Sequence, residues 1–128
     1  MIFEDGKILL VERGKEPLKG YWSIPGGIVG TGEKLEEGIR REVAEETGLD
    51  VEPYLMFEIF ERIMLDRAGK PEYHYVLIDY LCRRLSGEPV AASDASGVEW
   101  VAEENLHQYR LTEGTLGVIE RAFAKLQR

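Results

Sequence analysis

The fold is decided by the segment from residue 27 to residue 49, which reads GIVGTGEKLEEGIRREVAEETGL. Its C-terminal half carries three carboxylates close together, at Glu42, Glu45 and Glu46. Residues four positions apart lie on nearly the same face of an α-helix, so Glu42 and Glu46 point the same way. Like charges at this spacing destabilise an isolated helix by about a few tenths of a kcal/mol. A hard divalent cation with oxygen ligands would offset that repulsion.

The same segment predicts an amphipathic helix from about residue 34 to residue 47. Leu35, Ile39 and Val43 recur every four residues and form the expected buried stripe. Gly48 follows directly and predicts a left-handed C-terminal cap. Gly38 lies inside the helix, where glycine costs roughly 1 kcal/mol relative to alanine. We therefore expect a loop or ligand to approach the helix closely at that position.

The spacing of polar and glycine residues in this segment resembles that of the Nudix hydrolase family. The family's box is Gly, five residues, Glu, seven residues, Arg-Glu, an aliphatic residue, one residue, Glu-Glu, one residue, Gly and an aliphatic residue. The preceding residues 22–26 also look like the family's lead-in. Every specified position of the box is matched, by Gly27, Glu33, Arg41, Glu42, Val43, Glu45, Glu46, Gly48 and Leu49.

The resemblance implies a site for Mg²⁺ or Mn²⁺ on the helix. Glu42 and Glu46 are the first expected ligands and Glu45 is the next. Gly26 and Gly27 allow a sharp bend between strand and helix, and one of their carbonyls is expected to lie near the metal. Mg²⁺ takes one or two protein carboxylates and completes its octahedron with phosphate oxygens and water. A simple turn at the two glycines is the alternative.

Glu33 and Arg41 are expected to orient the metal-binding carboxylates. Arginine holds carboxylates through its planar fork, and such outer contacts fix the pose of a ligand. Glu33 could equally serve as a helix-start residue favoured by the helix dipole.

The implied reaction is hydrolysis of a pyrophosphate linkage in a nucleoside diphosphate joined to another group, which needs a general base. In the family this base comes from the box helix, here Glu42 or Glu45, or from a loop far along the chain. Asp94 and Glu99 are the loop candidates, and we favour Asp94 because residues 92–97 read as a flexible segment that can reach inward. A solvated loop acid is the alternative for each.

Residues outside the box are expected to contact the rest of the substrate. Arg13 ends a strand and could meet a phosphate, Gly26 lets the backbone approach the ligand, and Trp22 could stack on a base. Aromatic residues in strands more often pack in a core, which is the alternative for Trp22.

ADP-ribose is the lead substrate. The family's ADP-ribose subgroup tends to carry a proline where this chain has Met64, which weakens that choice. Nucleoside triphosphates are the alternative, and a non-catalytic nucleotide-sensing module is an alternative of another class.

Composition restricts the function further. The chain has 128 residues, which is typical of a single domain spanning 1–128. A net charge of −8 argues against binding a nucleic acid polymer. Cys82 is the one cysteine, so no intrachain disulfide is expected and a reducing, cytoplasmic location fits. The sequence shows no apolar run of about 20 residues, so no membrane span is expected.

Turn signals and residue alternation predict the remaining elements. Asp5-Gly6 is a hairpin signal, and a turn over 66–71 separates two antiparallel strands. Thr112 is expected to cap a final helix with an apolar stripe at Leu116, Ile119, Ala122, Phe123 and Leu126. The expected strands cover 7–13, 21–24, 50–63, 72–85 and 98–102, with one helical turn over 103–106.

This order of elements predicts an α/β fold in which a mixed sheet lies between two helices, an α/β/α sandwich. The Nudix fold implied by the resemblance is the same arrangement, with the box helix on one side and the C-terminal helix on the other. Family members have a longer strand before the first hairpin, where this chain has residues 1–3. Either the numbered chain begins inside that strand, or a second copy completes the sheet in a homodimer.

Overall fold

The computed structural model describes residues 1–126 and confirms the expected succession of strands and helices. Strand β5 ends at Ser86, and β6 begins only after an eight-residue connection at Ala95. The elements are β1 (Phe3–Glu4), β2 (Lys7–Arg13), β3 (Trp22–Ser23), α1 (Leu35–Thr47), β4 (Asp50–Leu65), β5 (Pro71–Ser86), β6 (Ala95–Ala102), the 3₁₀ helix η1 (Glu103–Gln108) and α2 (Thr115–Leu126).

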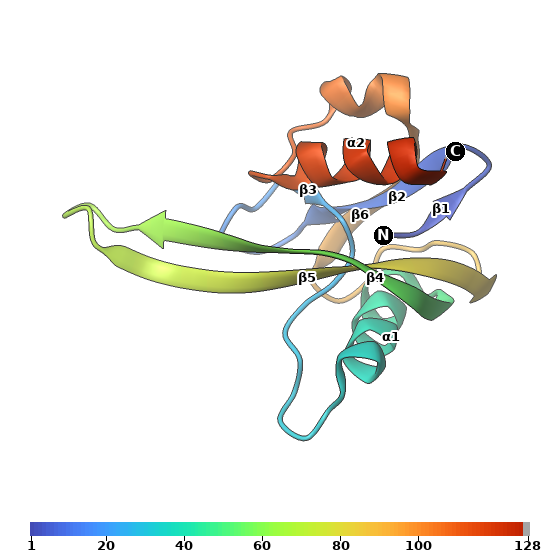
Figure 1. Ribbon diagram of the computed structural model, residues 1–128, viewed down its shortest axis with the longest axis horizontal. Helices are drawn as coiled ribbons and strands as arrows, with labels where there is room; N and C mark the ends of the chain where they lie inside the picture. Colours follow the sequence, from blue (N-terminus) through green and yellow to red (C-terminus); the bar gives the residue numbers. More distant parts are fainter. Residues whose placement is uncertain (127–128) are drawn as a thin grey trace.

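The strands form two sheets that lie between the two helices, as Figure 1 shows. In the first sheet β2 is paired antiparallel with β1, β3 and β6. The second sheet is the long β4–β5 hairpin. An isolated parallel bridge between Ile2 and Cys82 joins the two sheets. The expected α/β/α sandwich is therefore correct, and this bridge supplies the parallel pairing of the mixed arrangement.

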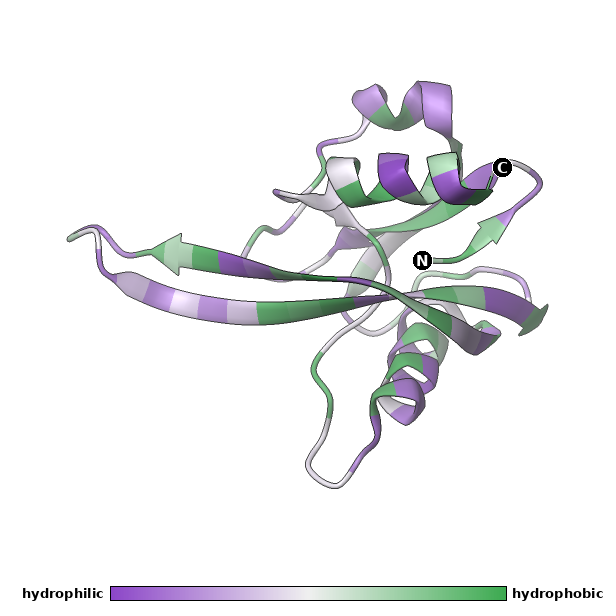
Figure 2. Cartoon of the chain, in the orientation of Figure 1, coloured by the Kyte–Doolittle hydropathy of each residue, from purple (hydrophilic) through white to green (hydrophobic). Residues whose placement is uncertain are grey.

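Two hydrophobic clusters fill the spaces on either side of the strands. The cluster beneath α2 includes Ile8, Leu10 and Ile119, and the cluster beneath α1 includes Leu9 and Val43. Successive residues of β2 thus point to opposite sides and both are buried, as in a strand covered on both faces. Figure 2 shows apolar residues on the strands between the helices and on the projecting hairpin. No helix within residues 1–126 is long and apolar enough to cross a membrane.

Helix α1 ends where the sequence predicts. Gly48 has a φ of 75° and donates its N–H to the carbonyl of Ala44, which satisfies one of the last free carbonyls. The expected buried stripe is only partly correct. Val43 is buried and Ile39 is partly buried, but Leu35 is 37% exposed because it begins the helix at the edge of the cluster.

Helix α2 begins at Thr115, three residues after the predicted cap, and it buries Ile119, Ala122 and Phe123 as predicted. Thr112 contacts this start through a 2.6 Å hydrogen bond between its hydroxyl and that of Thr115. The buried residues are Thr115, Val118, Ile119, Ala122 and Phe123. The prediction of Leu116 and Leu126 was wrong, since they are 43% and 42% exposed.

The strand boundaries also differ from the predictions in ways that affect the site. β4 and β5 are each longer than expected and project beyond both helices (Figure 1). β6 begins at Ala95 rather than residue 98, because Arg13 pairs with Ala95 across the end of β2. Residues 95–97 are therefore strand, and Asp94 lies directly before it.

Candidate active site

A clamp between Arg41 and Glu33 fixes the loop that precedes α1. Arg41 donates from Nε and Nη2 to the two Glu33 oxygens at 2.7 and 3.0 Å, and from Nη2 to the carbonyl of Ile28 at 3.0 Å. The backbone N–H of Gly30 donates to Glu33 at 2.8 Å. These bonds, that of Arg41 first, lower the pKa of Glu33 to about 2. The loop over 27–33 is thereby folded back onto the helix.

Arg41 also holds two of the box carboxylates. Its Nη1 donates to Glu42 at 2.9 Å and to Glu45 at 3.2 Å. The Glu42 side chain is 18% exposed and the Glu45 side chain 46% exposed, so Glu42 lies deeper. Glu42 also packs against Gly27, where an added Cβ would lie 2.4 Å from the carboxylate. Glycine at this position thus makes room for Glu42.

Glu46 is partly buried, as Glu42 is, whereas Glu45 is exposed. The N–H of Gly26 donates to its Oε2 at 3.3 Å. Burial raises the pKa of Glu46 to about 7, against the opposing Gly26 hydrogen bond, and the charges of Glu42 and Asp94 add to the rise. Arg13 acts in the opposite direction. These four charged side chains therefore share one electrostatic environment.

The loop that carries Asp94 is tied to the helix rather than flexible. The N–H groups of Val90 and Ala92 donate to the carbonyls of Thr47 and Glu46 at 2.9 and 3.0 Å, which satisfies the C-terminal end of α1. On the other side, the N–H of Gly14 donates to the carbonyl of Asp94 at 2.8 Å. The prediction of a flexible 92–97 segment was wrong, because these long-range bonds are invisible in the local sequence.

The Asp94 side chain pairs with a residue that sequence reasoning did not single out. Lys15 lies 2.9 Å from the Asp94 carboxylate, and both side chains are largely exposed. Lys15 follows Gly14, where an added Cβ would lie 2.9 Å from the Asp94 carbonyl. The loop after β2 therefore approaches the loop before β6 closely.

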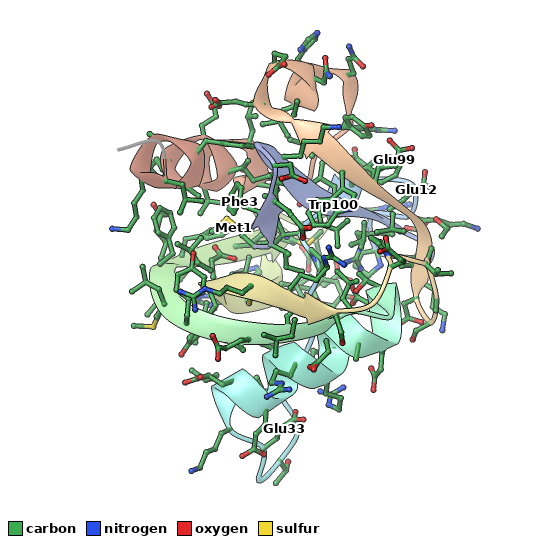
Figure 3. The ribbon with its side chains drawn as sticks, turned by 90° about the vertical axis from the view of Figure 1, so that its right-hand side faces the viewer. Met1, Phe3, Glu12, Glu33, Glu99 and Trp100 are labelled. Carbon is green, nitrogen blue, oxygen red and sulfur yellow. The ribbon has the colours of Figure 1, made fainter. Side chains whose placement is uncertain are left out.

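Glu99 and Trp22 lie on the opposite side of the sheet from Glu46. Glu99 pairs with Leu10, which belongs to the cluster under α2. It accepts a hydrogen bond from the hydroxyl of Tyr109, and the Tyr109 ring is packed edge-on against Trp22. Figure 3 shows Glu99 beside β6, far from Glu33 at the α1 end. The structure does not bring Glu99 or Trp22 to the box, and Trp22 packs against the core.

Arg13 lies on the box side of the sheet. Its Nε donates to the carbonyl of Pro17 at 2.8 Å, and its charge acts on Glu46. Gly26 and Gly27 border the same region through Glu46 and Glu42. Of the expected residues outside the box, the structure therefore groups Arg13, Gly26 and Asp94 with the box carboxylates.

Comparison with known proteins agrees with this geometry. A family model described as NUDIX domain matches residues 1–122. The chain belongs to the Nudix family. The Arg41 clamp and the three carboxylates on the last turns of α1 are thus the Nudix box of this chain, and α1 is its Nudix helix.

Relatives of this Nudix domain carry two kinds of name. An ADP-ribose pyrophosphatase of Methanocaldococcus jannaschii is 35% identical over 106 residues, covering 83% of this chain and 60% of that protein. The chain spans less than two thirds of the length of this and other curated relatives. A nucleoside triphosphatase NudI of Escherichia coli is 28% identical over 124 residues, covering 90% of this chain and 86% of that protein. The solved NUDIX domain of Shewanella oneidensis NrtR, complexed with ADP ribose, has a TM-score of 0.75 at 26% identity and covers 98% of this chain and 82% of that chain.

The Nudix box of this chain fits a divalent metal ion, which Nudix hydrolases generally use. Glu42 and Glu46 offer carboxylate oxygens, and their partial burial beside each other is the environment that a cation would stabilise. Among residues 1–126 no three acidic, imidazole or thiol groups converge closely enough to hold a metal alone. A metal here would therefore depend on substrate and water oxygens for its remaining positions.

Proposed function

We propose that this Nudix domain hydrolyses the pyrophosphate linkage of a nucleoside diphosphate joined to another group, with Mg²⁺ or Mn²⁺. The observation that carries the proposal is the arrangement around Glu46: a complete Nudix box, in which the charges of Glu42 and Asp94 act on the partly buried Glu46 carboxylate, which accepts the N–H of Gly26. A solvated acidic helix would expose all its carboxylates, whereas Glu46 and Glu42 are mostly withdrawn from water. The partial burial of Glu42 and Glu46 therefore favours a metal-binding role over that of a solvated helix surface.

ADP-ribose is the lead substrate of this proposal. The name of the M. jannaschii relative and the ADP-ribose complex of the S. oneidensis domain support it. A nucleoside triphosphate is the second candidate, supported by the name of the NudI relative, which matches this chain over most of both lengths. Both classes contain the phosphoanhydride that the box would bind, so the choice depends on residues elsewhere.

A metal ion bound at Glu42 and Glu46 would neutralise phosphate charge and make a water easier to deprotonate. Arg41 holds Glu42 and Glu45 in fixed poses, and Glu33 holds Arg41 in turn. Gly26 and Gly27 leave space for the diphosphate to approach these acids. Arg13 lies on the same side and would bind a phosphate oxygen.

Asp94 is the general base that we favour. Its negative charge contributes to the raised pKa of Glu46, and its backbone carbonyl accepts a hydrogen bond from the N–H of Gly14. Glu45 and Glu42 are alternatives on the helix, where the Nη1 of Arg41 donates a hydrogen bond to each. Asp94 would take the proton from the attacking water and pass it to solvent, since its side chain is largely exposed.

Three broader features belong to the same proposal. We treat residues 1–128 as a single domain, with a cytoplasmic location because the lone Cys82 is a buried free thiol. We also keep a homodimer, since the hairpin exposes Ile59, Ile63 and Val76, each more than half exposed. Light scattering of the purified chain tests the homodimer, and a monomer at all concentrations would refute it.

The decisive experiment is a hydrolysis screen with Mg²⁺ against ADP-ribose, other sugar nucleotides and nucleoside triphosphates, with identification of the products. We expect AMP and ribose 5-phosphate from ADP-ribose, with Glu46→Gln reducing turnover at least about 100-fold because a charged ligand is lost while shape is kept. Turnover of Glu46→Gln equal to that of the parent would refute the metal role. Binding without hydrolysis of any compound would instead indicate a nucleotide-sensing module.

A further inference from the structure

Arg62 differs from most arginines of this chain in its partners. Its Nη2 donates to the backbone carbonyl of Glu113 at 2.5 Å, and its Nε is buried without an acceptor. Within the described residues no carboxylate oxygen lies within 4.0 Å of it. The arginines that do form carboxylate pairs are Arg40, Arg41, Arg83, Arg84 and Arg121.

This lack of an anionic partner is energetically unfavourable at such a position. Arg62 is partly buried, and burial lowers its pKa because the charged form loses water. Removing a guanidinium from water is costly unless an anion and further hydrogen bonds replace the lost hydration. The chain carries a net charge of −8, so carboxylates are abundant, yet none within the described residues forms an ion pair with Arg62. The charges of Glu113 and Asp79 act on Arg62 from beyond 4.0 Å and only partly offset the effect of burial on its pKa. The nearby Glu61 is paired with His74 instead, at 2.7 Å.

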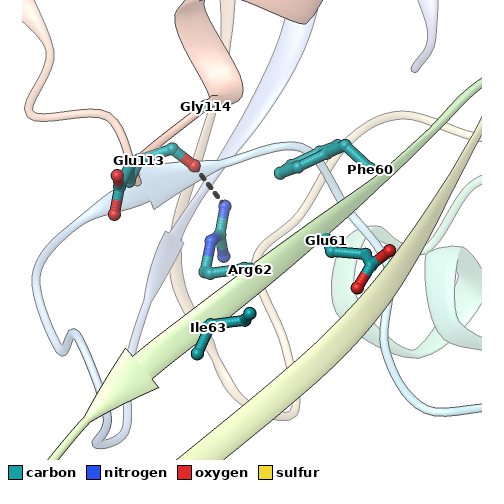
Figure 4. Close-up of a pocket in the computed structure, with 6 residues that line it drawn as sticks. All are labelled: Phe60, Glu61, Arg62, Ile63, Glu113 and Gly114. Carbon is teal, nitrogen blue, oxygen red and sulfur yellow. Dashed lines mark hydrogen bonds between the residues drawn. The ribbon is translucent and has the colours of Figure 1, made fainter. Parts of the chain in front are cut away.

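Arg62 also lines a cavity of about 160 Å³, between β4 and the turn before α2 (Figure 4). Phe60 forms one wall, with its ring centroid 5.7 Å from the Arg62 guanidinium carbon. Gly114 packs against the same ring, since an added Cβ would lie 3.0 Å from it, and Glu61, Ile63 and Glu113 complete the lining. The cavity is smaller than the roughly 300–1,000 Å³ that holds a whole drug-sized ligand, so it would take one part of a nucleotide.

Strand β3 and the residues that follow it contact both the turn beside the cavity and the Nudix box. The carbonyl of Trp22 accepts the N–H of Thr112 at 3.0 Å, which places the 112–114 turn against β3. A few residues further along the chain, Gly26 donates to Glu46. Arg13, at the end of the neighbouring β2, likewise has only a carbonyl partner, and its charge contributes to the lowered pKa of Arg62. Arg13, which has no carboxylate pair within the described residues, therefore acts electrostatically on both Glu46 of the box and Arg62 of the cavity.

We propose that Arg62 is a substrate-binding residue that, with Arg13, binds a phosphate oxygen of the nucleoside diphosphate, while the group attached to that phosphate enters the cavity beside Phe60. Phosphate is the anion that the arginine fork matches, and it would supply the direct anionic contact that Arg62 lacks. This inference rests on the proposed function, since it concerns the same substrate. The box binds the diphosphate common to all these substrates, so selection among substrates would depend on Arg62 and its neighbours in the β4–β5 hairpin.

The test measures ADP-ribose binding by calorimetry in buffer with EDTA, so that neither metal nor hydrolysis is required. We expect Arg62→Met to weaken binding about tenfold or more, because a hydrogen bond between charged groups is lost. Arg62→Lys should weaken it only about threefold, because charge is kept and the fork is lost. Arg83→Met is the matched control on the same hairpin, since Arg83 also contacts an aromatic ring, that of Tyr54, and we expect a change below about twofold.

Steady-state kinetics and thermal melting separate binding from a structural role. A substrate contact that is equal in ground and transition states raises KM with kcat nearly constant. A role limited to holding the Glu113 turn would lower Tm in both Arg62 variants and leave ADP-ribose affinity unchanged, which would overturn the inference. Wild-type protein that binds no ADP-ribose without metal would overturn it as well. If no compound is hydrolysed but Arg62→Met weakens ADP-ribose binding, the proposed reaction fails while the binding role stands.

Discussion

The tight contact between Gly27 and Glu42 predicts that Gly27→Ala disables the site without unfolding the protein. The added Cβ would lie 2.4 Å from the Glu42 carboxylate, whereas ordinary contacts begin at 3.4 Å, so the carboxylate must move by about 1 Å (3.4 − 2.4). The atoms that must move are the far end of a side chain, so stability should fall by less than about 1 kcal/mol. A misplacement of about 1 Å at a reacting centre can cost about 100-fold in rate.

The assay is kcat/KM for the best substrate with Mg²⁺, together with a denaturant melt. We expect Gly27→Ala to lose about 100-fold in kcat/KM. Gly30→Ala is the control in the same loop, because its added Cβ would meet Glu33 at 3.4 Å, and we expect less than about a threefold change. Full activity of Gly27→Ala would show that the observed position of Glu42 is unimportant. A parallel collapse of stability would show that the contact is structural.

Three further predictions concern acid stability, the general base and the core. The pKa of Glu33 falls from 4.5 to about 2 on folding, so its contribution is present above pH 4.5 and is lost as pH falls toward 2. The melting temperature of Glu33→Gln should therefore lie below that of wild type at pH 6 and converge with it near pH 2, and a constant gap would contradict the assigned shift. Asp94→Asn should lower kcat about 100-fold or more while Glu99→Gln changes it less than about twofold, and equal activities in a turnover assay would return the base to the helix. Ile119→Ala, at a fully buried position, should cost about 2–5 kcal/mol in a denaturant melt, against less than about 1 for the exposed Leu116→Ala; equal costs would refute the observed face of α2.

The parts of the fold that local chemistry determines were predictable. Gly48 adopts the left-handed cap expected after a helix, and the hairpin and strand order follow from turn residues and β-branched runs. The face of α2 was not predictable in the same way. Apolar residues occur at both 116 and 118, so two stripes satisfy the helical period, and only packing beneath the helix selects Val118.

The candidate site likewise contains residues whose positions local sequence predicts and residues whose positions depend on long-range contacts. The spacing within the box placed Glu42 and Glu46 on one face, and the Arg41 clamp on Glu33 matches the expected orienting role. The location of Asp94 depends on hydrogen bonds to Gly14 and to the end of α1, which join residues far apart in sequence. Glu99 was misjudged because β6 is covered on both faces, so its alternation does not reveal which side faces the box.

The projecting β4–β5 hairpin is tied to the body at two neighbouring points, with a consequence for its motion. Glu58 pairs with Arg121 through two hydrogen bonds, and Arg62 binds the carbonyl of Glu113. A two-stranded ribbon has little stability of its own beyond such ties. We therefore expect the fluctuations of the hairpin to be smallest at residues 58–62, where it is held, and to grow toward the tip at 66–70. Because Phe60 and Arg62 of the cavity belong to this held segment, we expect the spacing of its walls to be independent of motion at the tip.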